Sequence, residues 1–369
     1  MRATGVWYKR NMNRASPLPW LALTMGDPSG IGPEVLAAAW SDPTLHQMAR
    51  LLVIGRPEVM RRAVQLRQLA IPVVSCVDLV DAQRLASGAG CMPVLIVGDP
   101  EADTVEPANV SAAGGRAAYE AVCRAVELAL AKRIGGLVTA PLSKAALHRA
   151  GLPFPGHTEL LGSLCGVSDV GMLLYLPSGE RVRGVAGLGV VHVTLHTSLR
   201  SVFELLSVDA IVSKIKLIDE VFRQLFRVRA IARAPRLAVA ALNPHGGEGG
   251  LFGDEEARLI APAVQLGQGL GIDVHGPYPV DTLMIRAADG EFDGVVAMYH
   301  DQGHIALKLL DWFRAVNVTL GLPIVRTSVA HGTAPDRAWQ GTADPRGVRS
   351  AIAVAAELAA ARGMIPSGA

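Results

Sequence analysis

The chain has 369 residues, of which 50% are hydrophobic and 18% are charged. This composition supports a large buried core and excludes intrinsic disorder, and no run approaches the roughly 18 apolar residues that span a bilayer. Thirty-five basic and 33 acidic residues leave a net charge of +2, with the basic residues scattered along the chain, which argues against nucleic-acid and membrane partners.

The chain begins with a short basic segment, residues 1–17. The apolar run that follows it, residues 20–25, is too short for the hydrophobic region of a signal peptide. We therefore interpret residues 1–17 as an N-terminal extension without function, and Met12 is a second candidate for the start. Four cysteines without CxxC spacing indicate free thiols in a reducing cytoplasm.

Short apolar runs bounded by turns predict buried strands. They lie at 21–25, 51–55, 94–98, 136–140, 185–193, 237–242 and 294–299. Helical patterns lie at 115–132, 208–226 and, in an alanine-rich stretch without proline, 346–362. Strands that alternate with helices predict an α/β fold with largely parallel pairing. We find no linker, which fits two domains that exchange the chain more than once.

Two glycine-rich segments follow predicted strands. The first, GDPSGIGPE at 26–34, begins a helix, so its backbone amides are placed to bind an anion at the helix N-terminus. It lacks GxGxxG spacing, however, and Pro33 at the first helical position suits a plain strand-to-helix turn equally well. The second, residues 242–250, allows either close approach to a ligand or a tolerated loop.

Four histidines fall in predicted turns at strand ends: His157, His196, His245 and His300. Ligands of open α/β sheets bind at the carboxyl ends of strands, so side chains placed there can converge. Neutral imidazoles suit zinc and similar divalent ions, and three protein ligands with one open position form a catalytic site. We predict that His196, His245 and His300 hold a metal ion, and plain hydrogen bonding is the alternative for each of them.

His300 and His304 also have the i, i+4 spacing of a zinc-protease helix. That motif requires a glutamate after the first histidine, where this chain has Asp301. It also requires a stable helix, which we expect Gly303 to interrupt. A protease is therefore weakly supported.

Near the C-terminus, HGTAPD at 331–336 precedes GTADP at 341–345. A carboxylate held in such a turn, here Asp336, accepts hydrogen bonds from both hydroxyls of an adenosine ribose and repels a 2′-phosphate, which favours NAD over NADP. The same cofactor-binding stretch includes His331, Gly332 and Asp344.

Two cations and an amide precede this stretch within nineteen residues: Lys308, Asn317 and Arg326. Together they suit a carboxylate or phosphate group, because both cations can donate charged hydrogen bonds to it. Each of the three taken singly would more often be a surface residue.

Taken together, eight sequence blocks resemble the 4-hydroxythreonine-4-phosphate dehydrogenase family. They are GDPSGIGPE, TAPLSK (139–144), GLPFPGHTE (151–159), LNPHGGEGG (242–250), GPYPVDTL (276–283), MYHDQG (298–303), VNVTLGLPIVRTS (316–328) and HGTA (331–334). The blocks occur in family order and extend over nearly the whole chain.

The resemblance implies a fold like that of the isocitrate and isopropylmalate dehydrogenases, with two α/β/α domains, a cleft between them and a homodimer that shares each active site between subunits. We assign the cofactor-side domain to 18–135 and 313–369, and the metal, substrate and dimerisation domain to 136–312. By resemblance, the three histidines ligate a divalent ion (zinc, or magnesium, cobalt or manganese), one of them across the dimer interface. The positions that match the family's substrate contacts are His157, Thr158, Lys308, Asn317 and Arg326.

The activity that the resemblance implies is NAD-dependent oxidation of the secondary alcohol of a phosphorylated hydroxy acid, followed by decarboxylation, as in pyridoxine biosynthesis. The metal ion would polarise the alkoxide and then the ketone. Lys308 and Asp301 are the candidates for the group that removes the hydroxyl proton, on their proximity in the sequence alone.

Two departures from the family pattern leave the substrate open. Ala330 replaces the usual aspartate before HGTA, and His304 resembles the subgroup that acts on 4-phosphothreonate or 4-phosphoerythronate. A cis-dihydrodiol dicarboxylate dehydrogenase of the same fold is a further alternative. From other classes, we also consider a metal-dependent hydrolase that binds no NAD, and a non-catalytic ligand-binding protein, for which Ala330 is the one hint.

Overall fold

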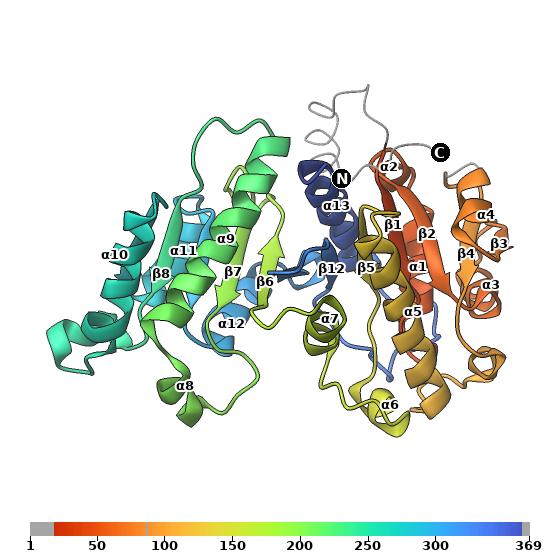
Figure 1. The fold of residues 1–369 in the computed structure, drawn as a ribbon, viewed down its shortest axis with the longest axis horizontal. Helices are drawn as coiled ribbons and strands as arrows, with labels where there is room; N and C mark the ends of the chain where they lie inside the picture. Colours follow the sequence, from red (N-terminus) through yellow and green to blue (C-terminus); the bar gives the residue numbers. More distant parts are fainter. Residues whose placement is uncertain (1–17, 86–87, 364–369) are drawn as a thin grey trace. The chain divides into compact units, whose positions relative to one another are not determined.

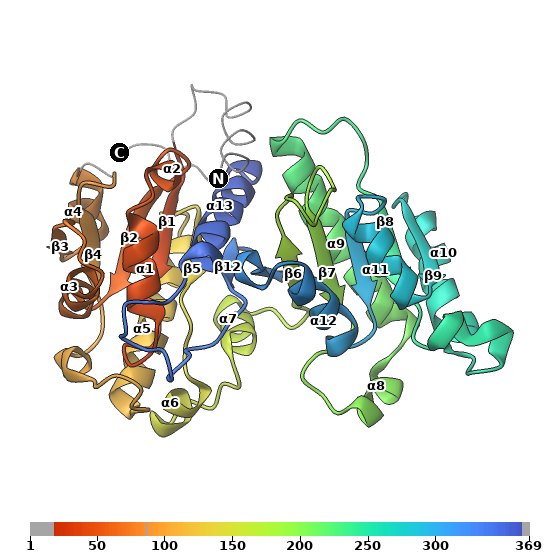
Figure 2. The same cartoon turned by 180° about the vertical axis from the view of Figure 1, so that it is seen from behind.

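The computed structural model describes residues 18–85 and 88–363, so the expected N-terminal extension lies outside the described residues. Backbone contacts divide the chain into two compact units. The central unit is Gly171–Gly321, and the terminal unit contains the described residues before and after it. Both units combine strands with covering helices, so the predicted α/β class is confirmed (Figures 1 and 2).

The chain passes between the units at 170/171 and 321/322, later than the expected 135/136 and 312/313. The difference at the first crossing comes from β5 (Gly136–Thr139), which pairs in parallel with β1 (Trp20–Thr24) of the terminal unit. The role expected of each unit stays a prediction.

In the terminal unit, parallel strands follow the order β3-β4-β2-β1-β5-β12. The other strands are β2 (Arg50–Gly55), β3 (Val73–Cys76), β4 (Met92–Ile96) and β12 (Arg326–Val329). The helices are α1 (Gly32–Trp40), α2 (Pro43–His46), α3 (Pro57–Leu66), α4 (Leu79–Arg84), η1 (Pro100–Thr104), α5 (Ala112–Leu130), α6 (Lys144–Arg149), α7 (His157–Cys165) and α13 (Arg346–Ala361). Helix α5 covers one face of these strands, and α1 and α13 cover the other (Figures 1 and 2).

Helix α5 begins three residues before the predicted start. The Ser111 hydroxyl accepts the Gly114 amide and so caps the helix N-terminus. The predicted apolar face of the helix, which includes Val122 and Ala125, is buried in the core between α5 and the strands. The helical periodicity therefore identified the correct face.

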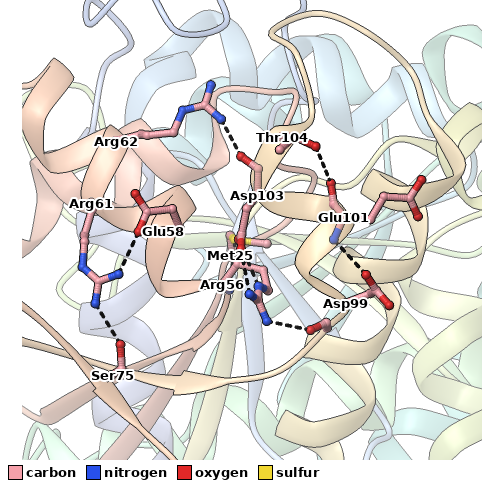
Figure 3. A network of polar contacts seen from close by, with 11 residues as sticks. Met25, Arg56, Glu58, Arg61, Arg62, Ser75, Asp99, Glu101, Asp103 and Thr104 are labelled. Carbon is pink, nitrogen blue, oxygen red and sulfur yellow. Dashed lines mark hydrogen bonds and ion pairs between the residues drawn. The ribbon is translucent and has the colours of Figure 1, made fainter.

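A polar network joins the end of β2 to the loop after β4 (Figure 3). The Arg56 guanidinium donates to both carboxylate oxygens of Asp103, at 3.0 and 2.7 Å, and to the Gly98 carbonyl at 2.9 Å. Arg62 of α3 donates to the Asp103 carbonyl. Because the Arg56 and Asp103 side chains are mostly buried, this network stabilises the carboxyl edge of the terminal unit more than an exposed ion pair would.

In the central unit, the strands follow the order β11-β6-β7-β10-β8-β9. They are β6 (Gly171–Leu176), β7 (Leu188–His192), β8 (Leu237–Ala240), β9 (Val274–Tyr278), β10 (Gly294–Ala297) and β11 (Val316–Leu320). Strand β6 is antiparallel to both β7 and β11, and the remaining pairs are parallel. The predicted pairing, largely parallel, is therefore correct.

Helices cover both faces of the strands of the central unit: α9 and α10 on one face, α11 and α12 on the other (Figures 1 and 2). The helical elements are α8 (Leu199–Leu205), α9 (Val208–Val228), η2 (Pro244–Gly250), η3 (Glu256–Ile260), α10 (Ala261–Gly269), α11 (Val280–Ala288), α12 (His300–Asp311) and η4 (Trp312–Arg314). No helix in the described part of the chain is long and apolar enough to cross a membrane.

All seven predicted strands are present, as β1, β2, β4, β5, β7, β8 and β10. The sequence analysis missed β3, β6, β9, β11 and β12. Strand β9 contains Gly276 and Pro277, two residue types that disfavour strands, and it lies at an edge of the strand order. None of the four cysteines, all of which lie in the described residues, forms a disulfide.

Two helical glycines provide a matched test of the packing. A Cβ on Gly115 of α5 would collide with the Ala146 carbonyl of α6, whereas a Cβ on Gly269 of α10 meets nothing within 4 Å. We expect Gly115→Ala to lower the free energy of unfolding by about 1–3 kcal/mol, and Gly269→Ala to leave it unchanged or raise it by up to about 1 kcal/mol. Urea denaturation measures both, and equal effects would contradict the close approach of α5 and α6.

Candidate active site

Helix α12 places three basic side chains on one face. His300, His304 and Lys308 are spaced four residues apart, which brings them to neighbouring positions on successive turns. The His300 and His304 rings stack, with centroids 3.9 Å apart and planes 11° apart. Gly303 does not interrupt this helix, so the expectation that it would do so was wrong.

Glycine is required at position 303 because α12 packs closely on β7 at this point. A Cβ at this position would stand 2.5 Å from His192 Nε2 and 2.6 Å from Val190 Cγ1. Contacts at those distances do not occur between real side chains, so the helix reaches this position only with glycine there. The cost in helix propensity is outweighed by tertiary packing.

His300 has one ring nitrogen engaged. Its Nδ1 lies 2.7 Å from a carboxylate oxygen of Asp301 and must donate to it, because an ionised carboxylate only accepts. This leaves Nε2 as the nitrogen available to a ligand. The His196 ring, in the loop after β7, lies 5.8 Å from the His300 ring, centroid to centroid.

The carboxyl ends of β7, β8 and β10 are tied together by buried side chains. The Gln302 amide accepts from the Met298 amide at 2.7 Å and donates to the Ala241 carbonyl at 2.7 Å. Thr194 donates to the Met298 carbonyl through its hydroxyl at 2.8 Å and through its backbone amide. The loop that carries His196 is therefore held beside the start of α12.

His245 lies in a left-handed turn after β8. Residues 245–249 all have positive φ, including the non-glycine residues His245 and Glu248. The buried Glu256 carboxylate holds the turn by accepting the Leu242 and Asn243 amides at 2.8 and 2.7 Å. A strained backbone kept in place by such contacts is typical of functional sites. The glycines of this segment therefore serve the turn itself.

The structure thus brings together two of the three predicted metal ligands, His196 and His300. Within residues 18–85 and 88–363 of one chain, no three His, Cys, Asp or Glu side chains are arranged to hold a metal ion. Two further histidines, His192 and His304, lie beside His300 instead.

His192, which the sequence analysis did not single out, ends β7 and is 1% exposed. Its Nε2 lies 3.1 Å from His304 Nδ1. Burial, together with the neighbouring His304 and His300, holds the pKa of His192 well below its usual range. Burial, with His300 and Lys308 nearby, lowers the pKa of His304 to about 4. Both rings are therefore neutral at pH 7.

Two of the predicted substrate contacts, Lys308 and Asn317, lie in the central unit and are half-buried. Burial lowers the pKa of Lys308, although Asp301 opposes this shift. The Lys308 ammonium lies 4.9 Å from the centre of the Trp312 ring. Asn317 of β11 donates to the Met172 sulfur at 3.1 Å, and its buried Oδ1 has no hydrogen-bond partner. A buried acceptor without a donor is costly unless a ligand supplies one.

The other three predicted substrate contacts, His157, Thr158 and Arg326, lie in the terminal unit. His157 and Thr158 begin α7 after the Gly156 N-cap, and His157 Nε2 is buried without a hydrogen-bond partner. Arg326 begins β12, is 1% exposed and donates to the Thr139 hydroxyl at 2.7 Å. Burial, with the charge of Arg326, keeps the pKa of His157 well below its usual range.

Burial lowers the pKa of Arg326 to about 9, so its guanidinium is still charged at neutral pH. Burial penalises the charged form of an arginine side chain. An anionic ligand reduces this penalty, because it places an opposite charge beside the guanidinium. The predicted contact between Arg326 and a phosphate or carboxylate group of the substrate stays a prediction.

The expected cofactor-binding stretch is anchored on the GDPSGIGPE segment. The Thr333 carbonyl accepts the Ile31 amide, the Trp339 amide donates to the Glu34 carboxylate at 2.8 Å, and the Trp339 indole donates to the Pro28 carbonyl at 2.8 Å. Residues 26–34 are buried throughout. Of the two interpretations of this segment, the structure therefore favours the structural turn.

Within this stretch the two acidic residues differ in their surroundings. The Asp336 side chain is 79% exposed, with only a distant ion pair to Arg337 at 4.0 Å. Asp344 is engaged by Arg346, at 2.6 Å in the shortest contact. His331 Nδ1 lies 3.0 Å from the Gly332 carbonyl. Asp336 is thus the carboxylate more accessible to a ligand.

Comparison with known proteins extends over most of the chain. Residues 47–355 match the family model described as pyridoxal phosphate biosynthetic protein PdxA. The chain is 43% identical over 345 residues to a 4-hydroxythreonine-4-phosphate dehydrogenase of Geobacter metallireducens, covering 94% of this chain and 97% of that protein. It is 42% identical over 342 residues to a D-threonate 4-phosphate dehydrogenase of Pectobacterium atrosepticum, covering 92% and 99%. The crystal structure of 4-hydroxythreonine-4-phosphate dehydrogenase from Klebsiella pneumoniae matches with a TM-score of 0.80 and 38% identity, covering 94% of this chain and 99% of that one.

The lowered pKa of Lys308 predicts a stability that depends on pH. Between the folded-state pKa and about 10.5, the unfolded chain binds a proton that the folded chain does not, so this residue makes stability rise with pH in that window. We expect Lys308→Met to remove this contribution and so to change the slope of melting temperature against pH in the window just below pH 10.5. Lys216→Met, which changes an exposed lysine of α9, is the control and should leave the slope as it is. Parallel curves for the wild type and Lys308→Met would contradict the prediction.

Proposed function

This chain is a dehydrogenase of the PdxA family. From this premise, we propose that it uses NAD and a divalent metal ion to oxidise the secondary alcohol of a phosphorylated hydroxy acid, of the 4-phosphohydroxy-L-threonine or 4-phosphothreonate type, with subsequent decarboxylation. The observation that carries the proposal is the pair of rings at the carboxyl ends of β7 and β10, His196 and His300, 5.8 Å apart.

The geometry of these two rings fits a shared ion. An imidazole bound through one nitrogen at about 2.1 Å has its ring centre about 3.2 Å from the ion, so two such rings can lie at most about 6.4 Å apart. The 5.8 Å between His196 and His300 satisfies this limit. The hydrogen bond from His300 to Asp301 fixes the ring and leaves Nε2 free, which is the usual arrangement behind a metal-ligating histidine.

Exposed apolar side chains follow each of the three predicted metal ligands along the chain. They are Leu199 and Phe203 after His196, Leu251 and Phe252 after His245, and Ile305, Leu309, Trp312 and Phe313 after His300. Apolar surface concentrated around a polar site is typical of an interface. We infer that a second copy of the chain covers this surface and that His245 completes the ligand set across it.

We assign substrate binding, proton transfer and ligand orientation to different residues of this chain. His157 and Arg326 bind the anionic part of the substrate, and the neutral state of His157 prevents charge repulsion with Arg326. Lys308, whose pKa burial lowers, accepts the hydroxyl proton, and Asp301 orients His300 rather than acting as the base. A bound divalent ion would supply polarisation of the reacting oxygen, and bound NAD would supply the acceptor for the hydride.

The decisive experiment is NAD reduction by the metal-loaded protein with four substrates: 4-phosphohydroxy-L-threonine, 4-phosphothreonate, 4-phosphoerythronate and an aromatic cis-diol dicarboxylate. We expect turnover with one of the first two and none with the cis-diol, which lacks the phosphate group that the other three substrates share. Turnover of the cis-diol alone, or of no substrate with NAD, would contradict the proposal.

The metal ligands are tested by elemental analysis of dialysed variants. Each of His196→Ala, His245→Ala and His300→Ala should lose the ion and most activity while keeping the melting temperature within a few degrees. His275→Ala, which removes a half-exposed histidine of β9, is the matched control and should keep its ion. Full occupancy in His245→Ala would remove His245 from the set.

The cofactor site is tested through Asp336. Loss of a charged hydrogen bond costs about 1.5–3 kcal/mol, so Asp336→Ala should weaken NAD binding by roughly ten to a hundred fold and narrow the preference over NADP. Michaelis constants for both cofactors provide the measurement. A lower melting temperature with an unaltered NAD to NADP ratio would show that Asp336 only supports the turn.

The dimer is tested at Leu309, which is 72% exposed on α12. A charge placed in an apolar interface is left unpaired on association, so Leu309→Glu should shift the protein towards monomer in analytical ultracentrifugation and reduce activity. Leu270→Glu places the same charge on an exposed leucine after α10 and should change neither property. A monomeric wild type with full activity would refute the shared site.

A further inference from the structure

A chain of three imidazoles runs from the core of the central unit to the candidate metal ligand. His192, at the end of β7 and 1% exposed, makes a hydrogen bond of 3.1 Å through Nε2 to Nδ1 of His304. The His304 ring stacks on the His300 ring, 3.9 Å away and nearly parallel. The first two rings belong to neither the predicted ligand set nor the predicted substrate contacts.

The local backbone is adapted to this contact. Gly303 lies where a Cβ would stand 2.5 Å from His192 Nε2, so a larger residue in the first turn of α12 would displace the His192 ring. His192 is the last residue of β7 and is 1% exposed, so its ring packs against α12 with little access to solvent. The position of His304 on α12 is therefore set by a strand residue as well as by its own helix.

His300 is held on two sides as a result. Asp301 fixes the Nδ1 edge of its ring at 2.7 Å, and His304 covers one face. A ring restrained in this way keeps Nε2 aimed in one direction before an ion arrives. Pre-organisation of this kind raises affinity because less side-chain freedom is lost on binding.

We propose that His192 is a positioning residue for metal binding: through its hydrogen bond it fixes His304, and His304 in turn fixes the ring of His300. The inference rests on the proposed function in so far as His300 is a metal ligand. It adds that affinity for the ion depends on a buried strand residue that touches neither the ion nor the substrate. Outer residues of this kind typically change metal affinity by about 10–100 fold when they are replaced.

A purely structural role makes a different prediction. If His192 only fills space, any residue of similar volume should preserve the affinity for the ion. If its hydrogen bond is what matters, a residue that keeps a polar nitrogen or oxygen near the position of Nε2 should preserve it, and an apolar residue should not. His192→Leu and His192→Gln separate these cases, because the glutamine amide reaches roughly as far as Nε2 of histidine.

The experiment is a titration of metal-free protein with Co²⁺, followed by the visible absorption of the ion, in competition with a chelator. We expect His192→Leu to weaken binding by about 10–100 fold and His192→Gln to restore most of it. His304→Leu should weaken binding similarly, and the double variant His192→Leu/His304→Leu should bind no more weakly than His304→Leu alone, because the two residues act in series.

His46→Leu is the matched control. It removes a partly buried histidine that also makes a hydrogen bond, to the Trp40 carbonyl at 2.8 Å, but lies in the terminal unit. It should lower the melting temperature and leave the dissociation constant for Co²⁺ unchanged. If His192→Leu does not fold, Gly303→Ala perturbs the same contact from the helix side without removing an imidazole, and it should also weaken binding.

The outcomes distinguish this inference from the proposed function. If His300→Ala still binds Co²⁺ as the wild type does, the ligand set itself is wrong. If His300→Ala loses the ion while His192→Leu and Gly303→Ala bind it with wild-type affinity, the ligand set stands and the positioning role is overturned. Equal weakening by His192→Leu and His192→Gln would likewise overturn it, since packing alone would then account for the effect.

Discussion

The candidate metal site depends on one buried side chain, the amide of Gln302. Gln302 lies in the first turn of α12, and by bonding the Met298 amide and the Ala241 carbonyl it ties that turn to the carboxyl ends of β10 and β8. Parallel strands end at the same edge of a sheet, so this bridge also determines where the loops after them begin. His300 starts α12 at this point, and Thr194 keeps the His196 loop beside it.

The two units provide different chemistry. The central unit brings four histidine rings together, His192, His196, His300 and His304, and burial lowers the pKa of His192 and His304. In the terminal unit, Arg326 is buried and its charge lowers the pKa of His157, a pair that would suit an anion. The expected cofactor-binding stretch of this unit is anchored on the buried segment 26–34 through Trp339. Each unit uses burial to shift the pKa of its functional groups, and in each the shift keeps a histidine neutral.

Much of this arrangement could be predicted from the sequence, because local patterns encode it. The periodicities identified seven of the twelve strands in the described residues and the buried face of α5. Of the four histidines expected at strand ends, His196, His245 and His300 follow strands of the central unit, whereas His157 begins α7, so that expectation was wrong for His157. Predictions from residue type were less reliable where the deciding contact is made by a distant part of the chain. Gly303 was expected to break a helix, since helix propensity ignores what lies against the helix. The GDPSGIGPE segment left an anion site and a structural turn equally open, and its contacts with Thr333 and Trp339 favour the turn.

The sequence by itself determined the α/β class, the positions of seven strands, and the residue types available for chemistry, because these follow from short-range periodicity and composition. Only the tertiary structure decided which of those residues meet. It paired His196 with His300, assigned Asp301 to the His300 ring, and brought His192 to His304 from 112 positions away. Such pairings depend on strand order and on the close approach of α12 to β7, and no pattern within a single segment records either.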